Sequence, residues 1–111
     1  PSLVLKDRKP VLAVGSPGGS RIIGYVAGAI VAHLDWGMDV QAAVSTPHAV
    51  NRFGKYDLEE GTSAADLGEP LGALGFEVGT RALTSGLHMI AIGDDLRGGA
   101  DPRREGIALG E

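Results

Sequence analysis

The chain has 111 residues and a mass of 11.4 kDa, which is the size of one domain. It contains no cysteine, which excludes disulfide bonds, thiolate metal sites and a cysteine nucleophile. Its 18 glycines follow no repeat period, so collagen is excluded and many tight turns are expected. Residues 1–55 carry six Lys or Arg and three Asp or Glu, whereas residues 56–111 carry four and eleven. This distribution argues against nucleic-acid binding, which usually needs a clustered basic face.

The first residues predict a pair of strands. Apolar runs at 3–5 and 11–14 flank the polar connector 6–9, a pattern typical of a hairpin. A hairpin turn this short favours glycine, because its residues need positive φ, yet Arg8 occupies the place where glycine is expected. The strand pattern begins almost at Pro1, without an initiating methionine, as in a piece of a longer chain, a trimmed product or a processed one.

A helix is predicted next, with Ser20 as its N-cap and Gly37 just beyond its end. Gly24 and Gly28, four residues apart on this helix, predict close packing of a second backbone. The apolar run Ile22 to Leu34 is 13 residues long, too short to cross a bilayer. Apolar residues recur at three- and four-residue spacing and predict one buried face, formed by Ile22, Ile23, Val26, Ala27, Ile30, Val31 and Leu34.

The rest of the chain predicts short elements. Asp39 can cap a helix that ends at Val44, and residues 87–92 are apolar on both sides, as in a strand inside a sheet. The pattern further predicts irregular structure over 45–62 with an extended piece at 49–53, a helix over 66–74, and strands over 76–78, 96–100 and 106–109. Together these elements predict a mixed α/β fold, with a mainly antiparallel sheet and flanking helices.

The loop 15–20 is the strongest candidate for a functional site. It joins a strand to a helix N-terminus, where backbone N–H groups are unpaired and the helix dipole favours negative charge. Its adjacent glycines, Gly18 and Gly19, let a phosphate, a carboxylate or a developing oxyanion approach the backbone. The loop lacks the lysine of a P-loop, the G-x-G-x-x-G of a dinucleotide site and the first glycine of a nucleophile elbow. A tight structural connection therefore remains an alternative interpretation of the same residues.

Other polar residues predict structural roles. His33, His48 and His88 have no companion at a metal-ligand spacing, so no metal site and no cofactor are expected. Asp94, Asp95 and Asp101 are typical of turns rather than of an EF-hand loop. For Arg103 and Arg104 we expect ion pairs within the fold or with a partner chain.

Several segments together resemble the C-terminal end of γ-glutamyltransferases. The most specific are GSPGGSRI at 15–22 and GGADPRREG at 98–106. They are supported by VLKDRKPVLAV at 4–14, by HLDWGMDVQAAVSTPHAVNRFG at 33–54, and by LEEGT, LGALGFEV and TSGLHMI further on. The resemblance covers essentially the whole chain, with departures at Arg8, where glycine is usual, and at His48, where many relatives have arginine.

The resemblance implies the C-terminal part of an N-terminal-nucleophile hydrolase, whose fold is an α-β-β-α sandwich. In such enzymes a precursor cleaves itself, and the new N-terminal threonine of the small subunit attacks a γ-glutamyl amide such as that of glutathione. Carried over to this sequence, Gly18 and Gly19 would be the oxyanion hole, and Ser16 and Pro17 would belong to the substrate-binding loop. The threonine lies upstream of this chain, so residues 1–111 are expected to be a single domain or fragment that is inactive alone. Its implied partners are the rest of the small subunit and the large subunit.

The sequence leaves alternatives open. The same scaffold could serve a different amidase, such as a cephalosporin acylase or a capsule poly-γ-glutamate enzyme. A non-catalytic assembly domain is a third interpretation, because the chain offers no nucleophile of its own. The resemblance implies a periplasmic or secreted protein, and a cytoplasmic one is not excluded. We also expect the chain alone to expose apolar sheet and helix surface, and therefore to be marginally stable or self-associating.

Overall fold

A computed structural model describes residues 1–110 of the chain. These residues form two compact units, one made of residues 1–46 and 85–110 and the other of residues 47–84. Each unit has its own sheet.

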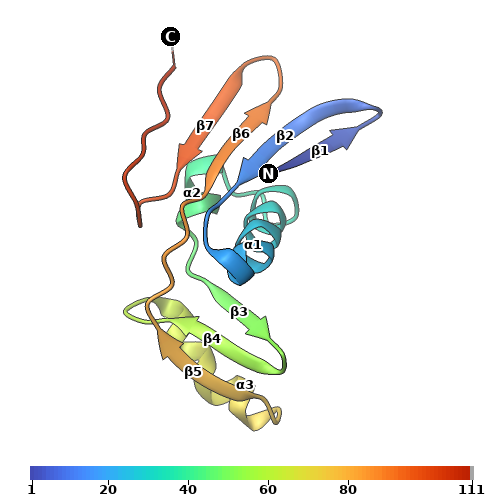
Figure 1. Cartoon of the computed structure of the whole chain (residues 1–111). Helices are drawn as coiled ribbons and strands as arrows, with labels where there is room; N and C mark the ends of the chain where they lie inside the picture. Colours follow the sequence, from blue (N-terminus) through green and yellow to red (C-terminus); the bar gives the residue numbers. More distant parts are fainter. Residues whose placement is uncertain (111) are drawn as a thin grey trace. The chain divides into compact units, whose positions relative to one another are not determined.

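The first unit is built on a four-stranded antiparallel sheet in the order β1-β2-β6-β7 (Figure 1). The strands are β1 (Ser2–Lys6), β2 (Lys9–Gly15), β6 (His88–Ile92) and β7 (Leu96–Ala100). The predicted hairpin and the internal position of β6 are confirmed. The predicted strand at 106–109 is wrong: this segment has no regular structure and runs beside β7, with Ala108 against Gly98.

The β1–β2 turn is formed by two non-glycine residues with positive φ. Asp7 and Arg8 both have positive φ, at 51° and 66°. Two successive positive φ values are the mark of a type I′ turn, whose twist matches that of the flanking strands. Aspartate tolerates this region better than most residues, whereas Arg8 adopts it at a modest cost in strain.

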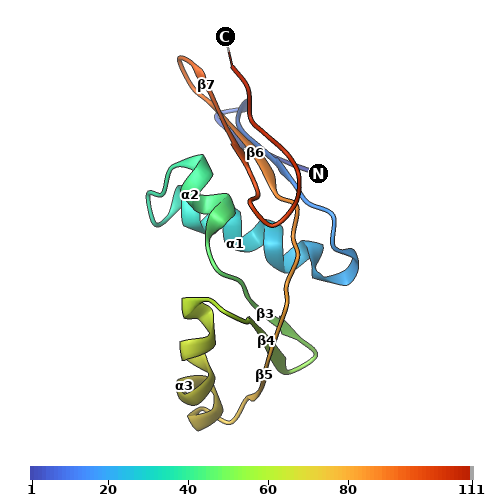
Figure 2. The same cartoon turned by 90° about the vertical axis from the view of Figure 1, so that its left-hand side faces the viewer.

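Two helices, α1 (Ile22–Leu34) and α2 (Val40–Ser45), cover one face of this sheet (Figures 1 and 2). The helix α1 starts later than predicted, because Gly19–Arg21 form a 3-10 turn and Arg21 takes the N-cap position without a side-chain bond. Ser20 is therefore not the N-cap. The buried residues of α1 are Tyr25, Val26, Ala29 and Ala32.

The predicted apolar face of α1 is only partly correct. Val26 is buried, but Ile23 is 80% exposed, and Val31 and Leu34 are also exposed. The inner face is formed instead by Tyr25 and Val26 together with the small side chains of Ala29 and Ala32. The expected close packing at Gly28 is wrong as well, since a Cβ placed there would meet nothing within 4 Å among the described residues.

The helix α2 is capped and anchored as its sequence suggests. Asp39 Oδ1 accepts a hydrogen bond of 2.8 Å from the Ala42 amide, which confirms the predicted N-cap. The side chain of Gln41 pairs with both backbone groups of Ala100 on β7, at 2.9 and 3.1 Å. A Cβ at Gly99 would lie 2.8 Å from the Val40 carbonyl oxygen, so a glycine is needed where α2 meets β7.

The second unit contains a three-stranded sheet in the order β3-β4-β5, with β3 (Ala49–Arg52), β4 (Lys55–Glu59) and β5 (Glu77–Arg81). The β3–β4 pair is antiparallel and the β4–β5 pair is parallel. The crossover between the parallel strands carries the 3-10 turn Ser63–Leu67 and the helix α3 (Gly68–Ala73), visible beside the sheet in Figure 2. The strand β4 lies within the range predicted to be irregular, so that part of the prediction is wrong.

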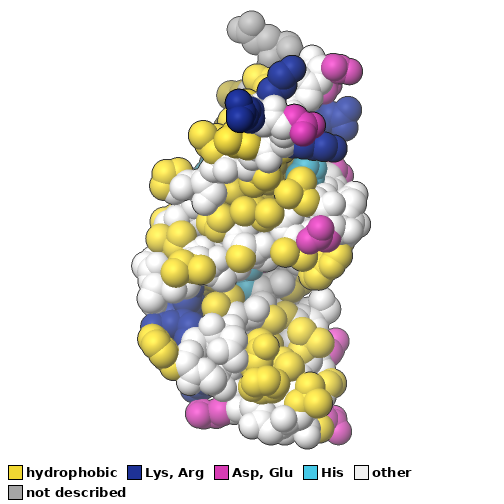
Figure 3. All heavy atoms as spheres, turned by 90° about the vertical axis from the view of Figure 1, so that its right-hand side faces the viewer, with side chains coloured by type: hydrophobic (Ala, Val, Ile, Leu, Met, Phe, Trp, Pro, Cys, Tyr) yellow, Lys and Arg dark blue, Asp and Glu magenta, His cyan; other side chains and the backbone are white. Residues whose placement is uncertain are grey.

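Both faces of the four-stranded sheet carry apolar side chains, but only one is covered. Leu12, Val14 and Met89 lie on the helix side and are almost fully buried. Leu3, Ala13 and Ile90 are register partners on the opposite face, where Leu3 is 68% and Ile90 45% exposed. Figure 3 shows one side of the molecule, on which hydrophobic side chains gather below the Lys and Arg side chains near its upper end.

No helix among the described residues is long and apolar enough to cross a membrane.

Candidate functional site

The loop between β2 and α1 adopts a conformation that only glycine reaches easily. Gly18 has φ 136° and ψ 11°, and Gly19 has φ 60°. These values place two successive glycines with positive φ in a turn that leads into the 3-10 segment. Pro17, Gly18, Gly19 and Ser20 are all exposed.

The amides of Gly18 and Gly19 are available to a ligand. Among the hydrogen bonds between described residues, none is donated by either of these two N–H groups. The Gly18 carbonyl accepts a bond of 3.2 Å from the Arg21 amide. Because that carbonyl belongs to the same planar peptide as the Gly19 N–H, the bond also fixes the direction of the Gly19 N–H.

Close contacts hold the loop on both sides. A Cβ at Gly18 would lie 2.8 Å from Cε2 of Tyr25, a buried residue of α1. A Cβ at Gly86 would lie 2.8 Å from Cγ of Pro17 and 2.9 Å from Cδ of Arg104. Side chains larger than hydrogen therefore have no room at Gly18 or Gly86 unless the loop moves.

The hydroxyl of Ser16 makes two hydrogen bonds at the base of the loop. It donates to the carbonyl oxygen of Pro17 at 2.7 Å and accepts from the amide of Gly86 at 3.1 Å. Ser16 is thus tied to the segment that precedes β6, 70 residues along the chain.

That segment is bonded to a buried carboxylate, Asp101, for which the sequence pattern predicted only a turn. Asp101 is 2% exposed, and its Oδ2 accepts from the Ser85 hydroxyl and, at 3.0 Å, from the Leu87 amide. Its Oδ1 accepts from the Arg103 amide at 2.9 Å and from Arg103 Nη1 at 3.0 Å. Burial by itself would raise the pKa of Asp101, but the bonds from Ser85, Leu87 and Arg103 outweigh it and leave the pKa below its ordinary value.

The ion pair expected for Arg103 is confirmed within the fold, with Asp101 as its partner. The same guanidinium donates to the carbonyl oxygens of Val44 at 3.1 Å and Thr46 at 2.9 Å. Arg103 therefore joins the turn after β7 to the C-terminal end of α2.

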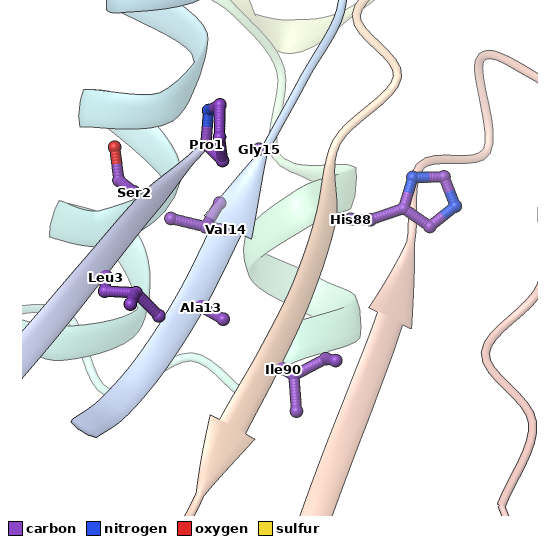
Figure 4. Close-up of a pocket in the computed structure, with 8 residues that line it drawn as sticks. All are labelled: Pro1, Ser2, Leu3, Ala13, Val14, Gly15, His88 and Ile90. Carbon is purple, nitrogen blue, oxygen red and sulfur yellow. The ribbon is translucent and has the colours of Figure 1, made fainter.

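A shallow hollow lies beside the loop on the open face of the sheet. Figure 4 shows its lining, which comes from β1, β2 and β6 together with Pro1: Pro1, Ser2, Leu3, Ala13, Val14, Gly15, His88 and Ile90. Most of this lining is apolar, so the hollow offers packing surface rather than polar contacts.

The histidines that the structure shows in hydrogen bonds have structural roles. His33 Nδ1 lies 2.7 Å from the Met38 carbonyl oxygen, and His88 Nδ1 lies 3.2 Å from the Gly86 carbonyl oxygen. Within residues 1–110 no group of three or more His, Cys, Asp or Glu side chains could hold a metal ion.

The sequence profile of the gamma-glutamyltranspeptidase family matches residues 1–111. The chain belongs to this family. It is 37% identical to the glutathione hydrolase proenzyme of Bacillus subtilis over 99% of its own length, and it spans 19% of that protein. It is also 33% identical, over 98% of its length, to the acylase ACY 1 proenzyme of a Pseudomonas species, of which it spans 20%.

Solved structures of gamma-glutamyltranspeptidases have the same fold. The Helicobacter pylori gamma-glutamyltranspeptidase T380A mutant superposes with a TM-score of 0.85 and 32% identity, over 94% of this chain and 60% of that one. The expected fold class, the C-terminal part of an N-terminal-nucleophile hydrolase with mainly antiparallel sheets and flanking helices, is confirmed. The chain spans about a fifth of the length of these two proenzymes.

Proposed function

We propose that this chain is the C-terminal part of the small subunit of a γ-glutamyltransferase or glutathione hydrolase, and that it supplies the oxyanion hole. The observation that carries the proposal is the pair of exposed amides at Gly18 and Gly19, which have no acceptor among the described residues. Membership of the gamma-glutamyltranspeptidase family supports the reaction class. The partners are then the rest of the small subunit, which brings the nucleophilic threonine, and the large subunit.

In this reaction the threonine hydroxyl attacks the γ-glutamyl carbonyl carbon and forms a tetrahedral intermediate. The carbonyl oxygen becomes an oxyanion, and the N–H groups of Gly18 and Gly19 donate hydrogen bonds to it. The threonine's own α-amino group takes the hydroxyl proton during the attack and gives it to the leaving amine as the intermediate collapses. The acyl-enzyme that remains is later resolved by water or by an amino acceptor. Donors already aimed at the oxyanion need no reorganisation as the charge forms, and one such donor is worth about 100- to 1,000-fold in rate.

The test uses the complete protein, including the residues upstream of Pro1, and a γ-glutamyl anilide as substrate. The Gly18→Ala variant places a Cβ against Tyr25 and forces the Gly18 amide out of position. We expect kcat to fall about 100-fold or more, and the affinity for a γ-glutamyl-like boronic acid, a tetrahedral analogue, to fall with it.

A matched control is Gly28→Ala, because a Cβ at that position meets nothing within 4 Å among the described residues. It should leave kcat within about twofold of the parent protein. Normal turnover and normal boronate affinity in Gly18→Ala would contradict the oxyanion assignment. Absence of any γ-glutamyl turnover in the complete parent protein would favour a non-catalytic assembly domain.

A second candidate function is that of an acylase on the same scaffold. The similarity of the chain to the acylase ACY 1 proenzyme supports this candidate. A cephalosporin acylase and a capsule poly-γ-glutamate enzyme would share the oxyanion loop but act on a different amide, and only the cephalosporin acylase would use an acyl group other than γ-glutamyl. Turnover of a γ-glutamyl anilide can be compared with that of a glutaryl anilide, which lacks the α-amino group. A strong preference for the γ-glutamyl compound supports the transferase, and the reverse preference supports the acylase.

A further inference from the structure

The hydroxyl of Ser16 is placed to control an atom that the proposed reaction uses. It has one proton, which it gives to the Pro17 carbonyl oxygen at 2.7 Å, and its lone pairs face the Gly86 amide at 3.1 Å. Both bonds are made at once, so the hydroxyl is held between two backbone groups from distant parts of the sequence.

The bond from Ser16 to the Pro17 carbonyl oxygen also fixes the orientation of the Pro17–Gly18 peptide. The Pro17 C=O and the Gly18 N–H belong to one planar peptide, which is trans here as it is at every other described bond. In a trans peptide the C=O and the N–H point in opposite directions. Holding the Pro17 oxygen on one side therefore aims the Gly18 N–H to the other side.

We propose that Ser16 is a positioning residue for the oxyanion hole: its hydroxyl orients the Gly18 N–H by holding the Pro17–Gly18 peptide. This inference rests on the function proposed above and goes beyond it by naming what orients one of the two donors. Ser16 acts through Gly18 and does not need to touch the substrate. The Gly19 N–H is oriented separately, through the bond from the Arg21 amide to the Gly18 carbonyl.

The other partner of Ser16 is itself firmly anchored. Gly86 lies between Ser85 and Leu87, and both neighbours donate hydrogen bonds to the buried Asp101 carboxylate. Hydrogen bonds to an ionised carboxylate are stronger than those between neutral groups. The anchor therefore extends from a buried charge, through Gly86 and Ser16, to the exposed peptide of Gly18.

Gly18 needs such support. Its φ of 136° lies in a region that side-chain-bearing residues rarely adopt, and a free glycine would sample many other conformations. A conformation of this kind persists only where the surrounding contacts determine it. Without the Ser16 hydroxyl, the Pro17–Gly18 peptide can rotate and the N–H spends less time aimed at the oxyanion.

The experiment compares Ser16→Ala and Ser16→Thr in the complete, self-processed protein. For Ser16→Ala we expect kcat for a γ-glutamyl anilide to fall roughly tenfold, while KM stays within about twofold. The affinity for the tetrahedral boronic acid should fall by the same factor as kcat. Ser16→Thr keeps the hydroxyl and should recover most of the lost kcat.

The matched control is Ser45→Ala. The Ser45 hydroxyl also donates to a backbone carbonyl, that of Gln41 at 2.7 Å, and accepts from a side-chain amide, but it lies on α2. Its loss should leave kcat and boronate affinity unchanged.

The outcomes separate this inference from the proposed function. A raised KM with unchanged kcat in Ser16→Ala would mean that Ser16 binds substrate directly, which overturns the positioning role. Unchanged kcat, KM and boronate affinity in Ser16→Ala, with a collapse in Gly18→Ala, would also overturn it and leave the oxyanion assignment standing. Normal behaviour of both variants would instead refute the oxyanion assignment itself.

Discussion

The guanidinium of Arg103 lies 3.0 Å from Oδ1 of Asp101, and the carboxylate side chain is fully enclosed. A buried charge of this kind is tolerated only when hydrogen bonds and an opposite charge replace the water that it has lost. Asp101 receives bonds from two side chains and two backbone amides. The pair therefore organises three parts of the first unit: the segment before β6, the turn after β7 and the end of α2.

The first prediction concerns Asp101→Asn. The pKa of Asp101 lies below its ordinary value of 3.8, so the folded state favours the ionised form. Its contribution to the free energy of unfolding is fully present above the unfolded pKa and is lost as pH falls from there through the folded pKa. We expect the free energy of unfolding of the parent protein to fall in this acid range. Asp101→Asn should be less stable at neutral pH by about 3 kcal/mol, and its free energy of unfolding should depend less on pH in the acid range.

Urea unfolding followed as a function of pH measures both effects. A suitable reference is Asp95→Asn, because Asp95 is exposed and its ion pair with Arg97 spans 3.5 Å at the surface. That variant should differ from the parent by less than about 0.5 kcal/mol at any pH. If the free energy of unfolding depended on pH in the acid range equally in the parent and in Asp101→Asn, the role given to this carboxylate would be refuted.

The second prediction concerns the shape of the Arg103 side chain. Lysine keeps the charge, but a single ammonium group cannot reach Asp101, Val44 and Thr46 with the fixed geometry of a guanidinium. We expect Arg103→Lys to lower the free energy of unfolding by about 2 kcal/mol. Arg97→Lys is the matched substitution at an exposed arginine and should change it by less than about 0.5 kcal/mol. The idea fails if both variants unfold at the same urea concentration.

Much of the fold was predictable, because local signals and tertiary structure agree there. The β1–β2 hairpin, the Asp39 cap and the internal strand β6 follow from short patterns that the structure retains. The strand β4 was missed because three of its five residues, Lys55, Asp57 and Glu59, are charged, although Asp57 and Glu59 are buried. Burial of charged side chains depends on partners that a local window of sequence does not contain.

In the candidate site, too, the residues with a local sequence signature were predictable and the contacts made only in the folded chain were not. The glycines of the loop were predicted because a strand–glycine–helix arrangement has a local signature. Asp101 precedes a proline and is typical of a turn residue, and the structure does place its carboxylate on the Arg103 amide two residues on. Its bond from Ser85, 16 residues away, exists only once β6 and β7 have paired. No spacing in the sequence reveals that Ser16 and Gly86 meet.

The third prediction tests the contact between Gly86 and the loop. A Cβ at Gly86 would overlap Pro17 and Arg104 at 2.8–2.9 Å, and Pro17 cannot yield without moving the Gly18 peptide. We expect Gly86→Ala in the complete protein to reduce γ-glutamyl turnover about tenfold or more. Its free energy of unfolding should also fall, by about 1–3 kcal/mol. The comparison is Gly72→Ala in α3, where an added Cβ meets nothing within 4 Å among the described residues. Full activity in Gly86→Ala would show that the loop does not depend on this contact.

The last prediction concerns the open face of the four-stranded sheet. Leu3 and Ile90 flank Ala13 across three neighbouring strands, and Leu96 and Leu5 extend the exposed apolar surface. Contiguous apolar surface of this kind promotes association in water. We expect the 111-residue chain alone to self-associate at micromolar concentration, as measured by sedimentation velocity.

Positive charges added to the open face of the four-stranded sheet should weaken this self-association. The double variant Leu3→Lys/Ile90→Lys places two ammonium groups on strands that both pair with β2, so copies stacked face to face would repel each other. The control Leu74→Lys/Phe53→Lys adds the same charge at exposed apolar positions of the second unit. Self-association should weaken in the first variant and persist in the second. Equal weakening in both would show that net charge alone is responsible. A parent chain that is monomeric and unfolds cooperatively would show that this face needs no cover at all.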